Sequence, residues 1–421
     1  MKVKIMGAAM EVGRSGFLVN SNNTNFLLDY GVLLRRRGMA PSYPLHIKPK
    51  DIDAIILSHA HLDHSGNIPS LFISGHNSVY ATPPTLELSK LLLDDMLKLE
   101  RNFCLFGSNE INAMMRNSKI IEYNKKTTIN DLTFELKYSG HVIGGSTIVV
   151  ESENKRLFYT GDINPSGSRL LHGADLDLDK VDVLITESTY SQTEQTPREE
   201  SENGLIKFAN EVIERKGTLF VPAFSVERSQ EIACVFQKHN FKHPIFMDGM
   251  ALKVNKIISK YPTYLREPTI FTNTLKNIIQ IRNNKDREDA IKNPCVIISP
   301  AGMLVGGNAI YYLHKLAFNS KNGIALVSYQ GDGTQGKKLL DTGKLSLQTE
   351  EVNVEAEVKQ LEFSGHGDRN ALLDVIKKIK GNPTVLAIHG DAKSCATFAN
   401  EINEKFGLKS YAPKLGEIFT F

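Results

Sequence analysis

The sequence predicts an α/β protein in which a part made of stacked β-sheets is followed by a parallel sheet with flanking helices. Three observations support this class. Short β-rich runs with few helices fill the first 190 residues, strands and helices alternate regularly up to about residue 355, and a strand–helix alternation resumes after it. We therefore expect domain boundaries at 1–190, 191–355 and 356–421.

The strands expected in the first part are short runs rich in β-branched and aromatic residues. They cover residues 3–6, 16–19, 25–28, 54–57, 132–137, 147–150, 156–159 and 183–186. One helix is expected at 85–99, because Leu88, Leu91, Leu92 and Met96 recur at helical spacing. These four side chains should form its buried stripe.

A polar stretch that includes Pro197, residues 191–201, predicts the crossing into the second part. There, an apolar helix face is expected at Leu205, Phe208, Ala209, Val212 and Ile213, and Ser225 should cap a helix that ends near Phe236. Strands are expected at 218–221, 245–247, 296–299 and 324–329. The last part should contain a strand at 359–363, a helix at 369–380, a strand at 385–388 and a helix at 393–406.

Composition argues against a disordered protein, and by itself it does not reveal nucleic-acid binding. The chain has 421 residues, 41% of them hydrophobic, which suffices for real cores. Its 50 basic and 47 acidic residues leave a formal net charge of only +3. Any affinity for nucleic acid must therefore come from local clustering of charge.

Cysteine usage and hydropathy indicate a cytoplasmic protein. The four cysteines lie far apart without CxxC spacing, which argues against a disulfide framework and a zinc ribbon. Residues 1–13 are too broken by glycine and charge for a signal peptide, and no run of about 18 apolar residues occurs. We expect a soluble, intracellular protein with no membrane association.

The most informative motif follows the strand expected at 54–57. His59, His61, Asp63 and His64 place four metal-capable side chains within six residues. Two of them, His59 and His61, can hold one ion, while Asp63 and His64 on the following turn face a second. Two ions about 3.5 to 4 Å apart can clamp attacking and leaving oxygens. The alternative is a polar loop of unconnected histidines.

Further metal-capable residues occur at later strand ends next to glycine: His141, Asp162 and His389. Glycine lets the backbone approach closely, and the preceding strand supplies rigidity. Each alone is weak evidence, but together they complete a set. His59, His61 and His141 would hold one ion, Asp63, His64 and His389 the other, and Asp162 would bridge two zinc ions.

This set of motifs resembles the metallo-β-lactamase superfamily. The resemblance implies an αββα sandwich and gives Asp29, in Leu-Leu-Asp-Tyr-Gly, the role of orienting the HxHxDH loop. A simple turn aspartate before Gly31 is the alternative role, and both can hold together.

The α/β segment inserted after Tyr190 is similar to that of the β-CASP nucleases of this superfamily. Glu187, His366 and His389 occupy positions that match its later motifs, and the resemblance implies that the third part completes the metallo-β-lactamase domain. Further stretches look like family signatures: 222–225 with Arg228 and Gln230, 247–251, 299–303 and 331–336. The match spans essentially the whole chain.

Within this group the sequence resembles RNA-cleaving members, because a histidine stands at position 389. The segments around Glu187 and His141 are similar to the endonuclease of the cleavage and polyadenylation specificity factor, in its short archaeal forms without a KH domain. Ser364-Gly365-His366 looks more like ribonuclease J, a 5′-directed exonuclease. Endonuclease and 5′-to-3′ exonuclease activity on single-stranded RNA, in 3′-end processing or decay, both stay open.

The reaction implied is hydrolysis by a water that the metals acidify, leaving a 5′ phosphate and a 3′ hydroxyl. The expected catalytic residues are His366, which would protonate the leaving oxygen, Glu187, which would support its imidazolium form, and Asp63. A purely structural His366 is the alternative, with Asp368 capping the helix that follows.

RNA contacts are harder to place from sequence. The candidates are Arg35 to Arg37, Arg228, Lys253 with Lys256, Gly333, Thr334, Lys337, Lys338 and Ser364. Backbone N–H groups of the glycine-rich loop 331–336 can cradle phosphates. Charge runs are usually solvated faces, so each has a structural alternative.

Two other functions compete with the ribonuclease. A small-molecule hydrolase of the glyoxalase II or lactamase type shares the metal ligands but needs no inserted domain, and a non-catalytic scaffold subunit of an RNA-processing complex would lack ligands that are present here. RNA-processing partner proteins are possible in either RNA role. The apolar ending 416–421 predicts a short β segment. The resemblance links such a segment to a homodimer, and an ordinary edge strand is the alternative.

Overall fold

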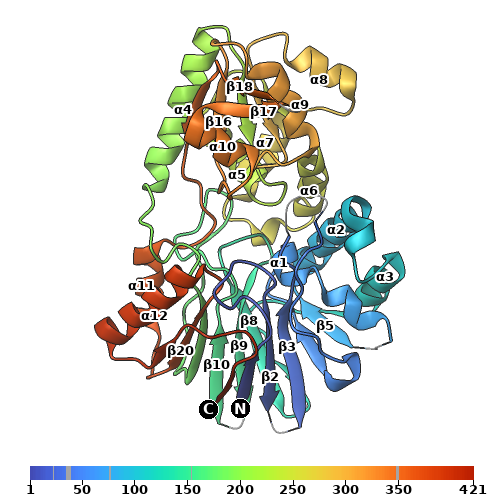
Figure 1. The fold of residues 1–421 in the computed structure, drawn as a ribbon, viewed down its shortest axis with the longest axis vertical. Coiled ribbons are helices and arrows are strands. Elements are labelled where there is room, and N and C mark those ends of the chain that lie inside the picture. The colour runs from blue at the N-terminus through green and yellow to red at the C-terminus, as the bar shows by residue number, and fades with distance from the viewer. Residues whose placement is uncertain (22, 35–38, 75–76, 153, 348–349) are drawn as a thin grey trace. The chain divides into compact units, whose positions relative to one another are not determined.

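The computed structural model describes residues 1–21, 23–34, 39–74, 77–152, 154–347 and 350–421 (Figure 1). The chain forms two compact units. Unit 1 comprises Met1–Gly167, Gly173–Glu194 and His366–Phe421, and unit 2 comprises Ser168–His172 and Gln195–Gly365. Unit 2 thus interrupts unit 1. Among the helices of the described ranges, none combines the length and apolar character that a membrane span requires.

Unit 1 contains two seven-stranded sheets, ordered β22-β1-β2-β3-β4-β5-β6 and β21-β20-β11-β10-β9-β8-β7. The strands of the first sheet are β1 (Lys2–Ile5), β2 (Gly16–Ser21), β3 (Thr24–Tyr30), β4 (Ala54–Ile56), β5 (Ser78–Ala81), β6 (Ser118–Ile120) and β22 (Ile418–Thr420). Those of the second are β7 (Thr127–Ile129), β8 (Leu132–Tyr138), β9 (Ser146–Ser152), β10 (Lys155–Tyr159), β11 (Val183–Glu187), β20 (Thr384–Ile388) and β21 (Ser410–Tyr411).

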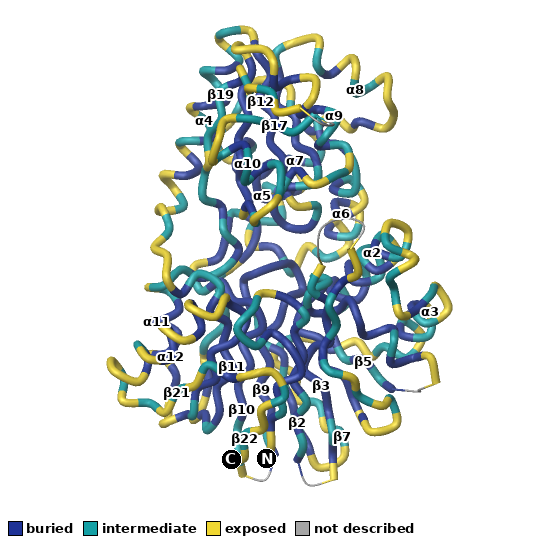
Figure 2. Tube along the Cα trace, in the orientation of Figure 1, coloured by how far each residue is buried: buried dark blue, intermediate teal, exposed yellow. Residues whose placement is uncertain are grey.

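The core of unit 1 lies between these sheets, where inward-facing side chains such as Phe17 and Phe26 meet Phe134 and Ile148. Helices cover the outer faces: α2 (Pro83–Glu100) and α3 (Ser108–Arg116) pack on the first sheet, α11 (Arg369–Lys378) and α12 (Ala392–Phe406) on the second. Figure 2 shows the strands buried inside this αββα sandwich. The predicted fold class is therefore confirmed for unit 1.

Unit 2 is built on a parallel six-stranded sheet in the order β14-β13-β15-β12-β16-β19. Its strands are β12 (Leu219–Pro222), β13 (Ile245–Met247), β14 (Ile278–Gln280), β15 (Val296–Ser299), β16 (Gly323–Leu326) and β19 (Glu357–Gln360), with a hairpin of β17 (Lys344–Leu347) and β18 (Glu350–Asn353) beside it. Its helices are α4 (Arg198–Glu214), α5 (Arg228–Lys238), α6 (Met250–Ile258), α7 (Pro268–Asn277), α8 (Asn284–Ala290), α9 (Gly307–Leu316) and α10 (Gln335–Thr342).

Both faces of the sheet are covered at its centre, which is why β12, β15 and β16 are largely continuous apolar runs, whereas the edge strands β14 and β19 carry polar residues. Leu205, Ile232 and Ala251 of α4, α5 and α6 belong to one core, and Tyr312 and Leu339 of α9 and α10 belong to the other. The predicted parallel sheet with flanking helices is confirmed.

Several local predictions are wrong. The strand expected at 359–363 in the third part is β19, which pairs with β16 and therefore belongs to unit 2. Ser225 caps no helix, because α5 begins only at Arg228, after a tight turn in which Arg228 N–H donates to the Val226 carbonyl. Strand β16 ends at Leu326, which leaves Tyr329 on the following loop.

The buried stripe of α2 also differs from the prediction. Leu88 and Met96 are buried as expected, but Leu91 and Leu92 are only half-buried, and Leu86 and Leu93 take their places in the core. The helix starts at Pro83, and the face that it turns toward the sheet is set by this packing.

Candidate metal centre

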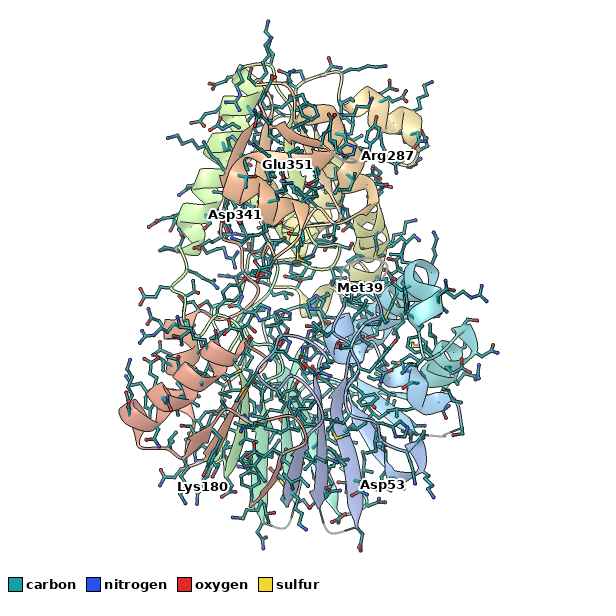
Figure 3. The ribbon with its side chains drawn as sticks, in the orientation of Figure 1. Met39, Asp53, Lys180, Arg287, Asp341 and Glu351 are labelled. Atoms are coloured by element: carbon teal, nitrogen blue, oxygen red, sulfur yellow. The ribbon has the colours of Figure 1, made fainter. Side chains whose placement is uncertain are left out.

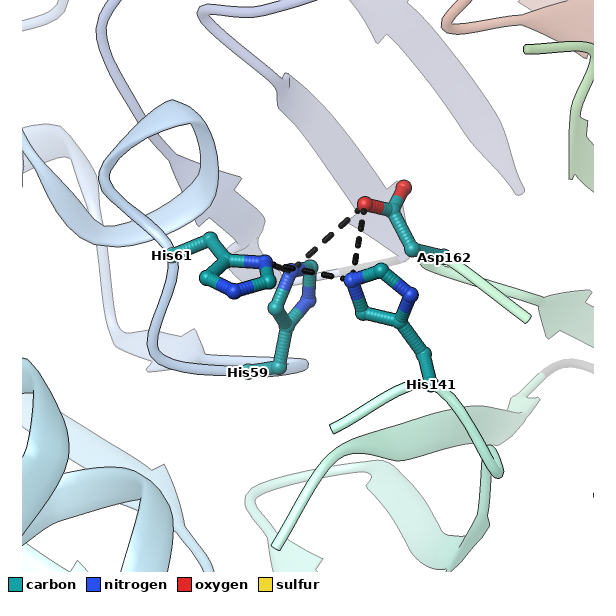
Figure 4. A group of neighbouring side chains, drawn as sticks. All are labelled: His59, His61, His141 and Asp162. Carbon is teal, nitrogen blue, oxygen red and sulfur yellow. Dashed lines mark hydrogen bonds and ion pairs between the residues drawn. The ribbon is translucent and has the colours of Figure 1, made fainter. Parts of the chain in front are cut away.

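The first group of metal-capable side chains consists of His59, His61, His141 and Asp162 (Figure 4). His59 and His61 lie between β4 and the short helix α1 (Leu62–Ser65), while His141 follows β8 in a turn that Gly140 enters with a φ of +73°. The Nδ1 atom of His61 lies 3.1 Å from Nε2 of both His59 and His141. Asp162 Oδ2 lies 3.6 Å and 3.5 Å from these same Nε2 atoms.

The second group consists of Asp63, His64, Asp162 and His389. Asp63 and His64 are on α1, and His389 follows β20. His389 Nε2 lies 3.3 Å from Asp63 Oδ2, and His64 Nε2 lies 3.3 Å from Asp162 Oδ1. Both histidines are at most 1% exposed, so solvent contributes little to holding these rings.

Asp162 is common to both groups. Its side chain, beyond the end of β10, is buried, and its two oxygens face different sets of imidazoles: Oδ2 faces His59 and His141, Oδ1 faces His64 and His389. A carboxylate whose two oxygens face different sets of imidazoles can ligate two ions at once. The seven ligands predicted from sequence thus lie together around one aspartate.

The spacing of these atoms fits a divalent metal. Tetrahedral zinc with Zn–N bonds of about 2.0–2.1 Å places neighbouring ligand atoms about 3.3 Å apart, close to the 3.1–3.6 Å of the first group. Burial lowers the pKa of His59 well below its ordinary value and lowers that of His61 too, which favours the neutral ring that binds metal. Asp162 Oδ1 is buried, and two imidazole nitrogens lie 3.3 Å from it.

The negative charge around the second group also favours a bound cation. Burial by itself lowers the pKa of His64, but the carboxylates of Asp162, Asp63 and Asp29 overcome this and raise that pKa well above its ordinary value. Three carboxylates around one buried ring need a positive partner. A metal ion meets this need, so we conclude that the cluster is a metal site.

Asp29 lies where its predicted orienting role requires. It is fully buried at the end of β3, with a φ of +58°. Its Oδ2 lies 2.7 Å from His64 Nδ1, and its Oδ1 accepts a hydrogen bond from Ser58 N–H at 2.7 Å. The Ser58 hydroxyl and Tyr159 OH donate to Oδ2 as well, at 2.6 and 2.8 Å. Asp29 therefore holds the start of the HxHxDH loop and one of its rings.

The next pair, His366 and Glu187, adjoins the first metal group. Glu187 ends β11 fully buried, and its Oε2 and Oε1 lie 2.8 and 3.0 Å from His366 Nδ1. The His366 ring lies 4.4 Å from the His141 ring, centre to centre. Burial alone lowers the pKa of His366, but the Glu187 carboxylate, helped by Asp162, raises it to about 9. Asp368 also caps α11, as expected, by accepting from Ala371 N–H at 2.8 Å.

Sequence reasoning missed the groups that hold these ligands in place. The Thr189 hydroxyl lies 3.2 Å from His389 Nδ1, and His389 N–H donates to the Ala8 carbonyl at 2.9 Å. Tyr159 and Ser58 adjoin motif residues in the sequence, which was the only signal that could have found them. Ala8 has no such signal, because it meets His389 only through the fold.

The predicted RNA contacts all lie in unit 2, apart from Arg35 to Arg37, which are outside the described residues. Arg228 is only 8% exposed and pairs with Glu231, which disfavours it as a phosphate ligand. Lys253 is exposed, Gly333 is exposed with a φ of +75°, and Ser364 is half-buried, its carbonyl accepting from Arg198.

The remaining candidates surround the start of α10. The Thr334 hydroxyl caps this helix by accepting from Lys337 N–H at 3.2 Å. Lys337 pairs with Asp341 and Lys338 with Glu351, two carboxylates labelled in Figure 3. These lysines are therefore partly neutralised, although exposed ion pairs of this kind are weak and exchangeable.

Comparison with known proteins agrees with this architecture. The metallo-beta-lactamase superfamily model matches residues 11–197, the Beta-Casp domain model 229–339, and the model of the Zn-dependent metallo-hydrolase RNA specificity domain 351–413. "RNase aCSPSF2" of Saccharolobus solfataricus is 35% identical over 99% of this chain and 84% of its own length. The chain belongs to the β-CASP family of the metallo-β-lactamase superfamily.

Other relatives extend this picture of the β-CASP family. "Probable RNase MJ4" of Methanocaldococcus jannaschii is 35% identical and covers 99% of both chains. "Transcription termination factor FttA" of Pyrococcus abyssi is 32% identical over 98% of this chain and 70% of its own length. A crystal structure of an Enterococcus faecalis protein of unknown function shares the fold, with a TM-score of 0.65, 15% identity and 99% of each chain covered. The β-CASP resemblance predicted from sequence is thereby confirmed.

Proposed function

We propose that this β-CASP protein is a zinc-dependent ribonuclease that holds two ions and hydrolyses phosphodiester bonds in single-stranded RNA during RNA processing or decay. The observation that carries the proposal is the pair of ligand groups joined at Asp162, with the His366–Glu187 pair beside them. The relatives that match over most of their length include proteins named as RNases.

His59, His61 and His141 would hold one zinc ion, Asp63, His64 and His389 the other, and Asp162 both. When bound, such a pair of ions acidifies a water and offsets charge on the phosphoryl oxygens. The chain's own contribution is to fix the ligands: Asp29 orients His64, and Thr189 and Ala8 hold the His389 ring and backbone.

His366 is the group we assign to proton transfer. Because Glu187 holds Nδ1, donation to the departing ribose 3′ oxygen falls to Nε2. The pKa of about 9 keeps this ring protonated at neutral pH, which is the form that an acid needs. Glu187 is a positioning residue, since it acts through the ring of His366. Asp63 would act as a ligand of the second ion.

The decisive experiment compares two end-labelled single-stranded RNAs, one with a 5′ triphosphate and one with a 5′ monophosphate. Internal fragments from both would indicate an endonuclease, and mononucleotides from the monophosphate alone would indicate a 5′-to-3′ exonuclease. Parallel assays with a thioester and a lactam complete the test. Hydrolysis of the thioester or the lactam without RNA cleavage would indicate a small-molecule hydrolase instead of a ribonuclease. Metal binding without hydrolysis of any of these substrates would favour a scaffold subunit.

We also propose that the protein acts as a cytoplasmic homodimer through its C-terminal strand. Strand β22 pairs with β1 at the border of its sheet, and Ile418 on it is 59% exposed. An open strand edge can pair with a second copy. Light scattering behind a sizing column should give about twice the chain mass, and Ile418→Lys should give a single-chain mass. A single-chain mass for the unmodified protein would end this proposal.

A further inference from the structure

Three neighbouring loops at the carboxyl ends of β12, β15 and β16 carry exposed hydrophobic side chains. We name Phe224, Val305 and Tyr329 the loop cluster; they are 38%, 48% and 61% exposed. Of the large hydrophobic side chains that are exposed in the described part of unit 2, three of five belong to this cluster, the others being Ile279 and Phe318. Ligands of open parallel sheets commonly bind outside the carboxyl ends of the strands.

These loops meet at Gly302. A Cβ built on Gly302 would lie 3.1 Å from the Phe224 nitrogen and 2.9 Å from the Ser328 hydroxyl, so the three chain segments come together there. Gln330 strengthens the junction, because its side-chain amide donates to the Gly302 carbonyl at 2.9 Å. The ring of Tyr329 lies over Gly331, with Cε1 3.4 Å from the position of an added Cβ.

A second observation points to a ligand at this junction. The Ser328 hydroxyl oxygen is buried and has no hydrogen-bond partner within the described structure. The residue as a whole is 9% exposed. A buried polar atom without a partner is costly, so its place beside exposed rings suits a ligand with both an aromatic face and polar groups.

We propose that the loop cluster binds bases of single-stranded RNA, with Tyr329 and Phe224 stacking on them and Ser328 hydrogen-bonding to a polar base edge or ribose. The inference deepens the proposed ribonuclease function and rests on it. A base fits better here than a phosphate, because Asp332 is exposed on the same loop and Lys337 and Lys338 already pair with carboxylates. Stacking on aromatic side chains is also tolerant of sequence.

The absence of tryptophan from the chain provides a direct test. Tyr329→Trp places a single fluorophore at the cluster, and Phe318→Trp places a matched exposed one elsewhere in unit 2. Each zinc-loaded variant is mixed by stopped flow, on a timescale shorter than cleavage, with a single-stranded oligoribonucleotide and with an abasic ribose-phosphate oligomer of equal length.

We expect the oligoribonucleotide to quench Tyr329→Trp strongly, the abasic oligomer to quench it weakly, and neither to affect Phe318→Trp. Equal quenching by both oligomers would mean a backbone contact and would overturn the base site. So would unchanged Tyr329→Trp fluorescence while the RNA binds.

The affinity of Tyr329 variants for RNA provides a second test of the base site. Loss of one stacked base costs roughly 5- to 150-fold in affinity, so Tyr329→Ala should raise the Kd for RNA by such a factor, while Tyr329→Phe should restore binding. If Tyr329→Ala binds and cleaves RNA like the unmodified protein, the base site is wrong and the ribonuclease proposal stands. If the unmodified protein cleaves no RNA, the ribonuclease proposal itself is wrong, and fluorescence still reports on the site.

Discussion

At the scale of single residues, Asp162 has the largest influence on the site. It is the one member shared by both ligand groups, and each of its oxygens faces imidazoles of a different group. Each of the other ligands belongs to one group, so its loss leaves the ligands of the other group in place. Loss of Asp162 removes a ligand from both groups, because both use the same carboxylate.

With the two zinc ions proposed above, replacing Asp162 by asparagine should reduce bound zinc from about two ions per chain to less than one. Asparagine offers one neutral oxygen, which cannot bridge two cations as a carboxylate does. His141→Ala should lose mainly one ion, because His141 belongs to the first group alone. Mass spectrometry of metal in the dialysed proteins measures this, with exposed His314→Ala as the control. Two ions per chain in Asp162→Asn would refute the bridging role.

His366→Ala should keep its zinc and lose cleavage by about 10²- to 10⁴-fold, the usual contribution of an acid–base residue. Glu187→Gln should shift the alkaline limb of the kcat/KM profile to lower pH. The sign follows from the acid role: His366 works while protonated, so activity falls as pH rises through its pKa, and Glu187 is what raises that pKa. An unmoved alkaline limb would remove Glu187 from this role.

At the scale of elements, the four-residue helix α1 carries two ligands but is too short to be stable alone. Tertiary contacts hold it. Ser15 N–H donates to the Asp63 carbonyl at 2.7 Å, and Val32 N–H donates to the Leu62 carbonyl at 2.9 Å. Gly31 allows this approach, because a Cβ there would lie 1.9 Å from the Asp63 carbonyl oxygen.

Gly31→Ala should therefore displace α1, lower the thermal midpoint of unfolding and weaken zinc binding together. Forced overpacking typically costs about 1–3 kcal/mol. Gly107→Ala is the matched control, since its added Cβ would approach only the flexible Glu110 carboxylate, at 3.4 Å. Calorimetry and metal analysis of both variants provide the measurement. A Gly31→Ala protein as stable and zinc-loaded as the control would contradict the packing argument.

At the scale of the whole molecule, the two units have separate cores, and all seven ligands belong to unit 1. They come from segments as distant in sequence as β4 and β20. A metal that binds only the folded site stabilises the unit that supplies the ligands.

Chelation should accordingly speed amide hydrogen exchange in β4, β10 and β20 of unit 1 and leave β12 and β15 of unit 2 nearly unchanged. Exchange followed by mass spectrometry of peptides resolves the two units within one sample. Adding zinc back should restore protection, while magnesium should not, because imidazole ligands favour zinc. Equal acceleration in both units would show that the metal stabilises the chain as a whole.

Much of this protein could be predicted from its sequence. Strands 245–247 and 296–299 coincide with β13 and β15, because both are short apolar runs with clear ends, and β15 is buried on both faces. The HxHxDH spacing places four ligands within one local turn, so pattern alone is informative there. His141, Asp162 and His389 were identified by their strand-end positions and by the family resemblance.

What sequence could not decide depends on contacts between distant segments. Packing that no local pattern encodes decides three features: the pairing of β19 with the sheet of unit 2, the start of α5 at Arg228, and the exposed position of Tyr329. By itself, the sequence determined the fold class and the ligand types, because periodicity and side-chain chemistry are local properties. Only the tertiary structure decided that one aspartate joins two ligand groups and that Asp29, Thr189 and Ala8 hold them, because these residues meet through folding.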